Sequence, residues 1–214
     1  MKLYFTPGAC SLAVHIALVM VGRPYEIERV DYATRRTSSG RDFWQINPKG
    51  YVPALEGEDG KVFTEIPVIL QYLDARSPNA ALLPADFERR MRAFEWLHFL
   101  ATEVHKSFSP LFRPNTPVSF LKSGREHLNR RLSIVESALE TEPYLLGAEF
   151  SVVDGYLHTI CRWLPDQQMD IVRWPALKKH FDRVSTLRVV KVALSNEMSH
   201  SKDYDQPGAV GCAR

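Results

Sequence analysis

The chemistry that this sequence could perform centres on a cysteine close to its N-terminus. A short apolar run from Leu3 to Phe5 ends at Thr6-Pro7-Gly8, and a long apolar segment begins at Leu12, which predicts a strand, a tight turn and a helix. Cys10 stands at the start of that helix, where backbone N–H groups and the positive end of the helix dipole favour a thiolate. The same position also suits a small, inert apolar side chain in a turn.

The residues after Cys10 exclude the dithiol chemistry of a C-x-x-C motif. In Cys10-Ser11-Leu12-Ala13 an alanine stands where that motif has its second cysteine, so no disulfide can form within this turn. The remaining cysteines, Cys161 and Cys212, are widely spaced. We therefore expect any redox or conjugating chemistry at Cys10 to use a thiol from outside the chain.

Charged side chains in the first third of the chain have two possible roles each. Arg35, Arg36 and Arg41 lie in a polar, basic loop and could hold a small carboxylate or simply be solvated. Glu65 stands before Pro67 at the start of an expected helix. There it either complements the helix dipole or binds an ammonium group.

Two histidines, His98 and His105, are seven residues apart in one expected helix and so should share a face, beside Glu103 and Lys106. Before any resemblance is considered, a polar helix edge that faces solvent is the favoured explanation of these residues. There is no H-E-x-x-H motif and no cysteine pair, so no metal is expected. The sequence also lacks a G-x-S-x-G elbow, a Walker loop and a dinucleotide-binding glycine pattern.

Composition narrows the possible partners. The 214 residues carry 27 basic and 25 acidic side chains, well mixed, so no nucleic-acid partner is expected. Three widely spaced cysteines argue against a disulfide framework and for a reducing, cytoplasmic compartment. The first apolar run is too short for a signal peptide, and no apolar stretch has membrane-spanning length, so no membrane partner is expected either.

Short strands and helices are expected to alternate in the first third of the chain. Strands are predicted at 3–5, 25–30, 51–55 and 61–64, and helices at 12–21, 42–46 and 65–75. Pro53 would place the third strand at a sheet edge or in a special turn. This order predicts a mixed four-stranded sheet covered by helices.

Helical periodicity without a convincing strand begins at Phe87. Helices are predicted at 87–108, 118–140, 175–184 and 187–196, and Ser151 with Asp154 forms a capping box that starts another. We expect one domain at 1–78, a linker at 79–86, a helical domain at 87–198 and a poorly ordered polar tail at 199–214.

Several motifs, in matching order and spacing, together resemble the bacterial beta-class glutathione transferases. They are Lys2-Leu-Tyr-Phe-Thr-Pro-Gly-Ala-Cys-Ser11, Asn47-Pro-Lys-Gly-Tyr-Val-Pro53, Thr64-Glu65, Glu103-Val-His-Lys-Ser-Phe-Ser-Pro-Leu111 and Phe150-Ser-Val-Val-Asp154. The similarity covers about residues 1–196. It implies an α/β, thioredoxin-like N-terminal domain, an all-α C-terminal domain, and a homodimer with the active site near the subunit boundary.

The resemblance also implies roles for individual residues. Cys10 would contact the sulfur of glutathione and could hold it as a mixed disulfide, and Val52 would pair its backbone with the tripeptide, before a cis bond to Pro53. Glu103 would reach in from the partner subunit. The expected catalytic residues are Cys10, Ser11 and His105. The expected glutathione-binding residues are Arg35, Val52, Pro53, Glu65 at the γ-glutamyl end, Ile66, His98, Glu103 and Lys106.

The leading hypothesis is a glutathione-dependent transferase, of the kind that acts in detoxification, with possible thiol-disulfide activity. The first helix and a nearby donor, Ser11 or His105, would stabilise the glutathione thiolate, which attacks a small apolar electrophile or forms a mixed disulfide with Cys10. The electrophile would lie between the domains against Phe108, Phe112 and Trp163. Glutathione is the co-substrate, and no metal takes part.

The alternative is a binding or carrier protein that keeps the fold but has weakened glutathione affinity. Its main support is Ile66, a bulky residue where the family usually has serine or glycine. His98 stands where asparagine is common, and Phe5 stands where tyrosine is common.

Overall fold

The computed structural model describes residues 1–200, which form two compact units. Among the described residues, the first unit contains Met1–Leu82 together with residues 188–200, and the second contains Leu83–Leu187. The tail expected at 199–214 lies, from residue 201 onward, outside the described residues. None of the helices in the described part of the chain is long and apolar enough to cross a membrane.

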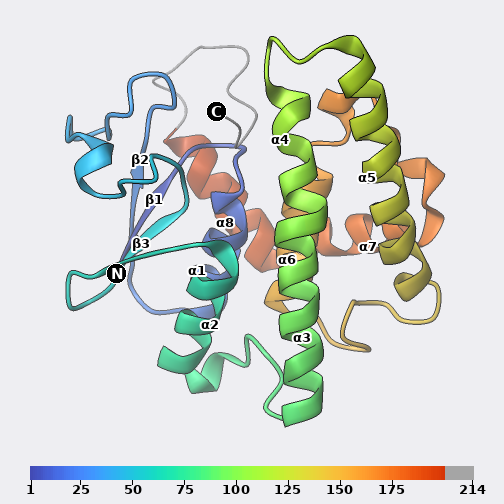
Figure 1. The fold of residues 1–214 in the computed structure, drawn as a ribbon. Helices are drawn as coiled ribbons and strands as arrows, with labels where there is room; N and C mark the ends of the chain where they lie inside the picture. Colours follow the sequence, from blue (N-terminus) through green and yellow to red (C-terminus); the bar gives the residue numbers. More distant parts are fainter. Residues whose placement is uncertain (201–214) are drawn as a thin grey trace. The chain divides into compact units, whose positions relative to one another are not determined.

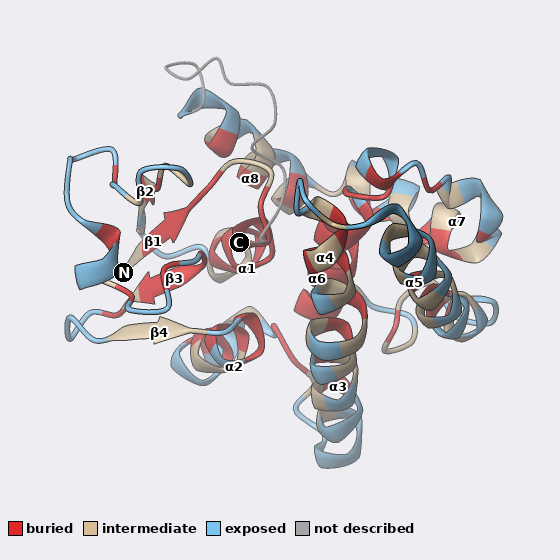
Figure 2. Cartoon of the chain, turned by 45° about the horizontal axis from the view of Figure 1, so that its top comes forward, coloured by how far each residue is buried: buried red, intermediate tan, exposed pale blue. Residues whose placement is uncertain are grey.

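The first unit is built on a mixed four-stranded sheet, as the sequence predicts, and the strand order is β2-β1-β3-β4 (Figures 1 and 2). Its strands are β1 (Lys2–Phe5), β2 (Glu26–Arg29), β3 (Ala54–Glu56) and β4 (Val62–Thr64). β1 pairs with β2 in parallel, which requires a crossover, whereas β1–β3 and β3–β4 are antiparallel. β3 is therefore an inner strand. Of the two alternatives predicted for Pro53, a sheet edge or a special turn, the structure has the turn. The strand begins only after the proline, so it loses no ladder donor, and the Val52–Pro53 bond is cis.

Helix α1 (Ser11–Val21) supplies the crossover between β1 and β2, and its residues from Ser11 to Leu18 are all buried (Figure 2). It is apolar on nearly every side because it packs on the sheet, on α2 (Ile66–Arg76) and on α8 (Arg188–Ser199). The α1 helix ends at Gly22, whose left-handed φ of 69° lets its N–H bond the carbonyl oxygen of Leu18. Two 3₁₀ turns, Phe43–Gln45 and Pro78–Ala80, complete the unit.

Helix α8 differs from the expectation, because it belongs to the first unit and not to a helical domain that runs to residue 198. A buried polar contact explains its position. His15 Nδ1 on α1 lies 3.3 Å from Oε1 of Glu197 on α8, and both side chains are buried. His15 Nε2 lies 3.1 Å from the hydroxyl oxygen of Tyr25. Helical periodicity in the sequence does not show on which unit such a helix packs.

The second unit begins with one long helical run (Figure 1). It comprises α3 (Phe87–Phe99), a π-helical segment (Leu100–His105) and α4 (Lys106–Phe112). The predicted end of this helix, at residue 108, is wrong by a few residues, because the helix ends at Phe112. Pro110 lies inside the helix, which continues for two residues and stops at the extended Arg113. A proline this close to the end interrupts few of the helix hydrogen bonds.

The rest of the second unit contains α5 (Val118–Leu139), α6 (Val152–Cys161), α7 (Pro175–Thr186) and the 3₁₀ turns Pro165–Gln167 and Ile171–Arg173. The predicted capping box is confirmed at the start of α6. Asp154 is fully buried, and one carboxylate oxygen accepts hydrogen bonds from the backbone N–H and the hydroxyl of Ser151, each at 2.9 Å. The other oxygen accepts from Leu145 N and lies 2.9 Å from His180 Nε2 on α7. This carboxylate therefore joins α6, α7 and the loop before α6.

We predict that Asp154→Ala lowers the free energy of unfolding by about 3 kcal/mol or more, because each donor left buried without an acceptor costs about 1–3 kcal/mol. Urea-induced unfolding measures the change. Asp154→Asn, which keeps one oxygen acceptor, should lower the free energy of unfolding by less than Asp154→Ala does. The control is Asp166→Ala, an exposed aspartate, which should stay within about 0.5 kcal/mol of the parent. Equal stability of the Asp154 and Asp166 variants would show that the buried carboxylate is not an anchor.

Candidate active site

The sheet register brings the candidate residues of the first unit to one end of the sheet. Tyr4 near the end of β1 pairs with Ala54 at the start of β3, and Ala54 pairs with Thr64 at the end of β4. Phe5 pairs with Arg29 at the end of parallel β2. The segments that carry Cys10, Val52, Glu65 and Arg35 all leave the sheet at this end. Loops at the carboxyl ends of strands are the usual place for ligand binding in open α/β sheets.

Cys10 is the N-cap residue of α1 and is 1% exposed. Its Sγ lies 3.3 Å from the carbonyl oxygen of Val52. The N–H groups of Leu12 and Ala13 already donate to the carbonyl oxygens of Ala9 and Cys10. The helix therefore acts on this sulfur through its dipole more than through these two amides.

Ser11 has a structural role in this turn. Its hydroxyl group accepts a hydrogen bond from Thr6 N and donates one to Thr6 O, both at 3.3 Å, and its side chain is buried. The hydroxyl thereby fixes the turn between β1 and α1. A further contact of this hydroxyl with a glutathione thiolate remains a prediction. The thiolate would compete with Thr6 for the hydroxyl group.

The loop from Asn47 to Pro53 is held from inside by a buried asparagine. Asn47 accepts a hydrogen bond from Lys49 N at 3.1 Å and donates to the carbonyl oxygen of Tyr51 at 2.7 Å. Gly50 has φ +71°, and a Cβ atom there would lie 2.2 Å from the ring of Trp44. The bond between Val52 and Pro53 is cis, as the resemblance implies. This arrangement fixes the Val52 carbonyl group beside the Cys10 sulfur.

Glu65 has the unusual backbone conformation φ 69°, ψ 118° immediately before α2. Residues held in sparsely populated conformations are concentrated at functional sites. The Glu65 carboxylate oxygen lies 2.6 Å from Lys49 Nζ and accepts a 3.4 Å bond from the Tyr51 hydroxyl, and Lys49 also donates to Thr64 Oγ1. The hydrogen bond to Glu65 raises the pKa of the Lys49 ammonium. Lys49 was not predicted as a site residue from the sequence.

Ile66 is 4% exposed, so its side chain packs into the first unit. The expected effect of this side chain on glutathione affinity stays a prediction.

The three arginines of the loop after β2 differ in the hydrogen bonds of their guanidinium groups. Arg36 donates to the carbonyl oxygen of Gly40, and Arg41 donates to the Tyr4 hydroxyl. The Arg35 guanidinium lies 4.0 Å from the centre of the Tyr32 ring, and its Nη1 has no hydrogen-bond partner among the described residues. Of the three, Arg35 has the cationic group that is best placed to hold a carboxylate.

The second unit contains an aromatic cluster that includes three predicted substrate residues. The Trp163 ring centre lies 5.4 Å from that of Phe108 and 5.8 Å from that of Phe112. The His105 ring packs 5.1 Å from Trp163, and its Nδ1 lies 2.7 Å from the Tyr156 hydroxyl. The structure therefore brings His105 together with the apolar residues expected near the electrophile.

His98 and His105 do not share a surface, contrary to the expectation. His98 is exposed and its Nδ1 bonds the carbonyl oxygen of Phe94, within its own helix. The π-helical segment between the two histidines accommodates extra residues per turn and rotates the helix after it. Beside them, Glu103 pairs with Arg131 on α5 at 2.8 Å, and Lys106 is exposed.

The described residues hold no group of three or more His, Cys, Asp or Glu side chains that could bind a metal ion.

Comparison with known proteins identifies the family. Residues 8–76 match the family model for the glutathione S-transferase N-terminal domain, and residues 99–187 match the model for the C-terminal domain. Over 198 residues the chain is 39% identical to Glutathione S-transferase GstA of Escherichia coli O157:H7, covering 92% of this chain and 98% of that protein. The chain therefore belongs to the glutathione S-transferase family.

Solved structures of similar proteins agree with this chain in fold and point to the same class of glutathione transferase. A sphingomonad glutathione S-transferase complexed with glutathione is 38% identical, with a TM-score of 0.89 over 92% of this chain and 99% of that one. The bacterial beta-class enzyme of Sphingomonas chungbukensis is also 38% identical, with a TM-score of 0.88 over 92% and 98%. The predicted fold, likeness to the beta class and transferase function are confirmed. No observation favours the non-catalytic alternative.

The loop before Pro53 generates a testable prediction. Gly50→Ala forces the Trp44 ring to move. It should therefore lower the free energy of unfolding by about 1 kcal/mol more than a matched change without a clash. That control is Gly60→Ala, with φ +76° and nothing within 4 Å of the added Cβ. Urea-induced unfolding and tryptophan fluorescence measure both effects. If both variants lose the same free energy of unfolding and the fluorescence spectrum of Gly50→Ala is unchanged, the close packing of Trp44 on Gly50 is contradicted.

Proposed function

We propose that this protein conjugates glutathione to small apolar electrophiles, with the sheet-end site of the first unit binding the tripeptide. Glutathione carries one ammonium group, two carboxylates and one thiol. The observation that carries the proposal is the convergence of Cys10, Val52 and Glu65 at one end of the sheet, with the Cys10 sulfur beside the Val52 carbonyl oxygen.

Glu65 is the proposed partner of the γ-glutamyl ammonium. Its carboxylate already pairs with an ammonium group, that of Lys49, and a carboxylate has acceptor capacity for a second one. The Val52 backbone would pair with the cysteinyl residue of the tripeptide, as an added strand does. Arg35 would hold the glycyl carboxylate, which its position over Tyr32 supports. Ile66 would contribute to the glutathione site at the start of α2. Pro53 and Lys49 would shape the loop from Asn47 to Pro53.

The proposed reaction is a nucleophilic substitution or addition. The glutathione thiol gives its proton to water, and the thiolate forms a carbon–sulfur bond with the electrophile. In a substitution the leaving group departs with its electron pair, and in an addition the anion that forms takes up a proton from water. The α1 dipole favours the thiolate near Cys10. On the resemblance, His105 and Lys106 would act on the sulfur and substrate side, and the Tyr156 hydroxyl would orient the His105 ring. His98 contributes less, because its ring bonds its own helix.

Phe108, Phe112 and Trp163 are the proposed apolar surface for the electrophile. The proposal also includes a cytoplasmic homodimer in which Glu103 of each subunit approaches the other subunit's glutathione. Turnover of glutathione with chlorodinitrobenzene tests the activity, and light scattering after gel filtration tests the homodimer. Absence of turnover by reduced protein that binds glutathione would refute the catalytic part.

We predict that Glu65→Gln raises the Kd for glutathione about tenfold or more, because a hydrogen bond to a charged group contributes about 1.5–3 kcal/mol. Titration calorimetry measures this constant. Glu58→Gln is the matched control, since Glu58 also pairs with basic side chains, Arg23 and Arg76, but lies in the turn between β3 and β4. Equal affinities of both variants would refute the role of Glu65.

A second prediction concerns the electrophile. Phe112→Ala should raise the KM for chlorodinitrobenzene about tenfold, because burying a phenyl ring contributes about 1.5–3 kcal/mol, and should leave the Kd for glutathione unchanged. Phe120→Ala on α5 removes an exposed phenylalanine and serves as the control. If Phe112→Ala weakens glutathione and the electrophile equally, the aromatic cluster does not form a separate electrophile surface.

A further inference from the structure

Arg35, in the loop after β2, has two unusual features. Its φ is +56°, in the left-handed region that few residues other than glycine adopt, and its backbone is fixed there from both sides. Arg35 N donates to the carbonyl oxygen of Asp31 at 2.9 Å, and Arg35 O accepts from Phe43 N at 2.8 Å. Its Nη1 is buried without a hydrogen-bond partner among residues 1–200. Strained backbone is concentrated at functional sites, and a buried nitrogen without an acceptor needs an explanation.

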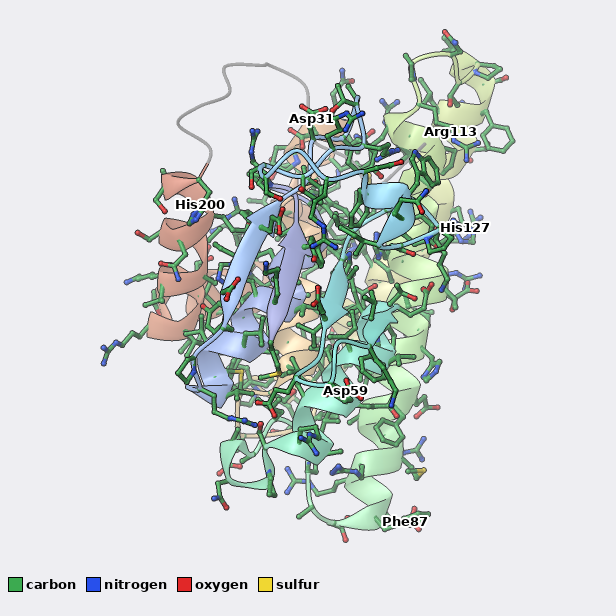
Figure 3. The ribbon with its side chains drawn as sticks, turned by 90° about the vertical axis from the view of Figure 1, so that its left-hand side faces the viewer. Asp31, Asp59, Phe87, Arg113, His127 and His200 are labelled. Carbon is green, nitrogen blue, oxygen red and sulfur yellow. The ribbon has the colours of Figure 1, made fainter. Side chains whose placement is uncertain are left out.

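The turn that carries Arg35 lies at the sheet end where the candidate site is formed. Figure 3 labels Asp31, which begins this turn, at that end, and Asp59, in the β3–β4 turn, at the opposite end. Asp31 Oδ1 accepts hydrogen bonds from the backbone N–H groups of Ala33 and Thr34, at 2.9 and 2.7 Å. Such bonds stabilise a tight turn, so the Arg35 side chain leaves the backbone from a fixed position.

Aromatic rings orient the Arg35 guanidinium. Its central carbon lies 4.0 Å from the ring centre of Tyr32 and 6.0 Å from that of Trp44, both within the range of a cation–π contact. The Tyr32 hydroxyl group is buried and makes no hydrogen bond within the described residues. The ring face, and not the hydroxyl group, is therefore the part of Tyr32 that acts on Arg35.

The same two rings adjoin other parts of the proposed glutathione site. The Trp44 ring packs on Gly50, in the loop that precedes the cis bond. The pKa of Tyr51 is raised, mainly by burial and then by the charge of Glu65, and Tyr32 also contributes to the shift. The Tyr51 hydroxyl group in turn donates to Glu65. The rings therefore connect the arginine to the loop and to the carboxylate of that site.

We propose that Tyr32 is a positioning residue, which holds the Arg35 guanidinium so that the site selects thiol peptides ending in a free carboxylate. The inference rests on the proposed function, in which Arg35 binds the glycyl carboxylate of glutathione. A guanidinium group presents its N–H groups in one plane, so the ring stacked on it decides where two of them meet the two carboxylate oxygens. A peptide with an ester at that end has no charge there and forms weaker hydrogen bonds.

The experiment is titration calorimetry of the full chain with reduced glutathione and with its glycyl ethyl ester. The parent should bind glutathione at least about tenfold more tightly than the ester. Tyr32→Leu should raise the Kd for glutathione about fivefold, as expected for a lost cation–π contact, and leave the Kd for the ester unchanged. Tyr32→Phe, which keeps the ring, should retain the preference of the parent. Arg36→Lys is the control, since Arg36 donates to Gly40 O, and it should alter neither constant.

A double-mutant cycle tests whether Tyr32 acts through Arg35. Arg35→Lys keeps the positive charge but loses the planar group that stacks on the ring, so it should also raise the Kd for glutathione. In that background Tyr32→Leu should raise the Kd by less than about twofold further, because the contact is already lost. If the two effects multiply in full, the side chains act independently and the inference is overturned.

The remaining outcomes contradict the inference in distinguishable ways. Equal weakening of glutathione and its ester by Tyr32→Leu would show that Tyr32 only supports the loop. A loss in Tyr32→Phe as large as in Tyr32→Leu would assign the effect to the hydroxyl group. Equal affinity of the parent for both peptides would show that Arg35 does not bind the glycyl carboxylate, whereas the proposed function would stand because glutathione still binds. A parent that binds neither peptide would refute the proposed function and the inference with it.

Discussion

The approach of the Cys10 sulfur to the Val52 carbonyl oxygen depends on the register of the sheet. β1 and β3 run antiparallel, so the turn after β1 and the loop before β3 meet at the same end. Antiparallel β4 returns Glu65 to that end, and parallel β2 sends the loop of Arg35 there. A register shift of one residue would turn each of these segments to the opposite face. The site therefore relies on strand pairing as much as on the identity of its side chains.

Buried or half-buried carboxylates whose partners are distant in sequence fix helices in both units. Glu197 meets His15 on α1 in the first unit, and Asp154 joins two helices and a loop in the second. In the second unit, the two oxygens of Glu136 on α5 accept from the backbone N–H groups of Ala176 and Leu177, at 2.9 and 2.8 Å. This carboxylate lies at the positive end of the α7 dipole. Apolar contacts alone tolerate small shifts of a helix, whereas such hydrogen bonds permit one position.

Local signals in the sequence predicted most elements, because caps, turns and alternation act over a few residues. Ser151 and Asp154 marked the start of α6, and Thr6-Pro7-Gly8 marked the end of β1. Features that depend on distant partners were missed. The π-helical segment before Lys106 leaves no local signal, and it separates two histidines that α-helical spacing places together. Lys49 was overlooked because its partner, Glu65, is brought to it by the β3–β4 hairpin.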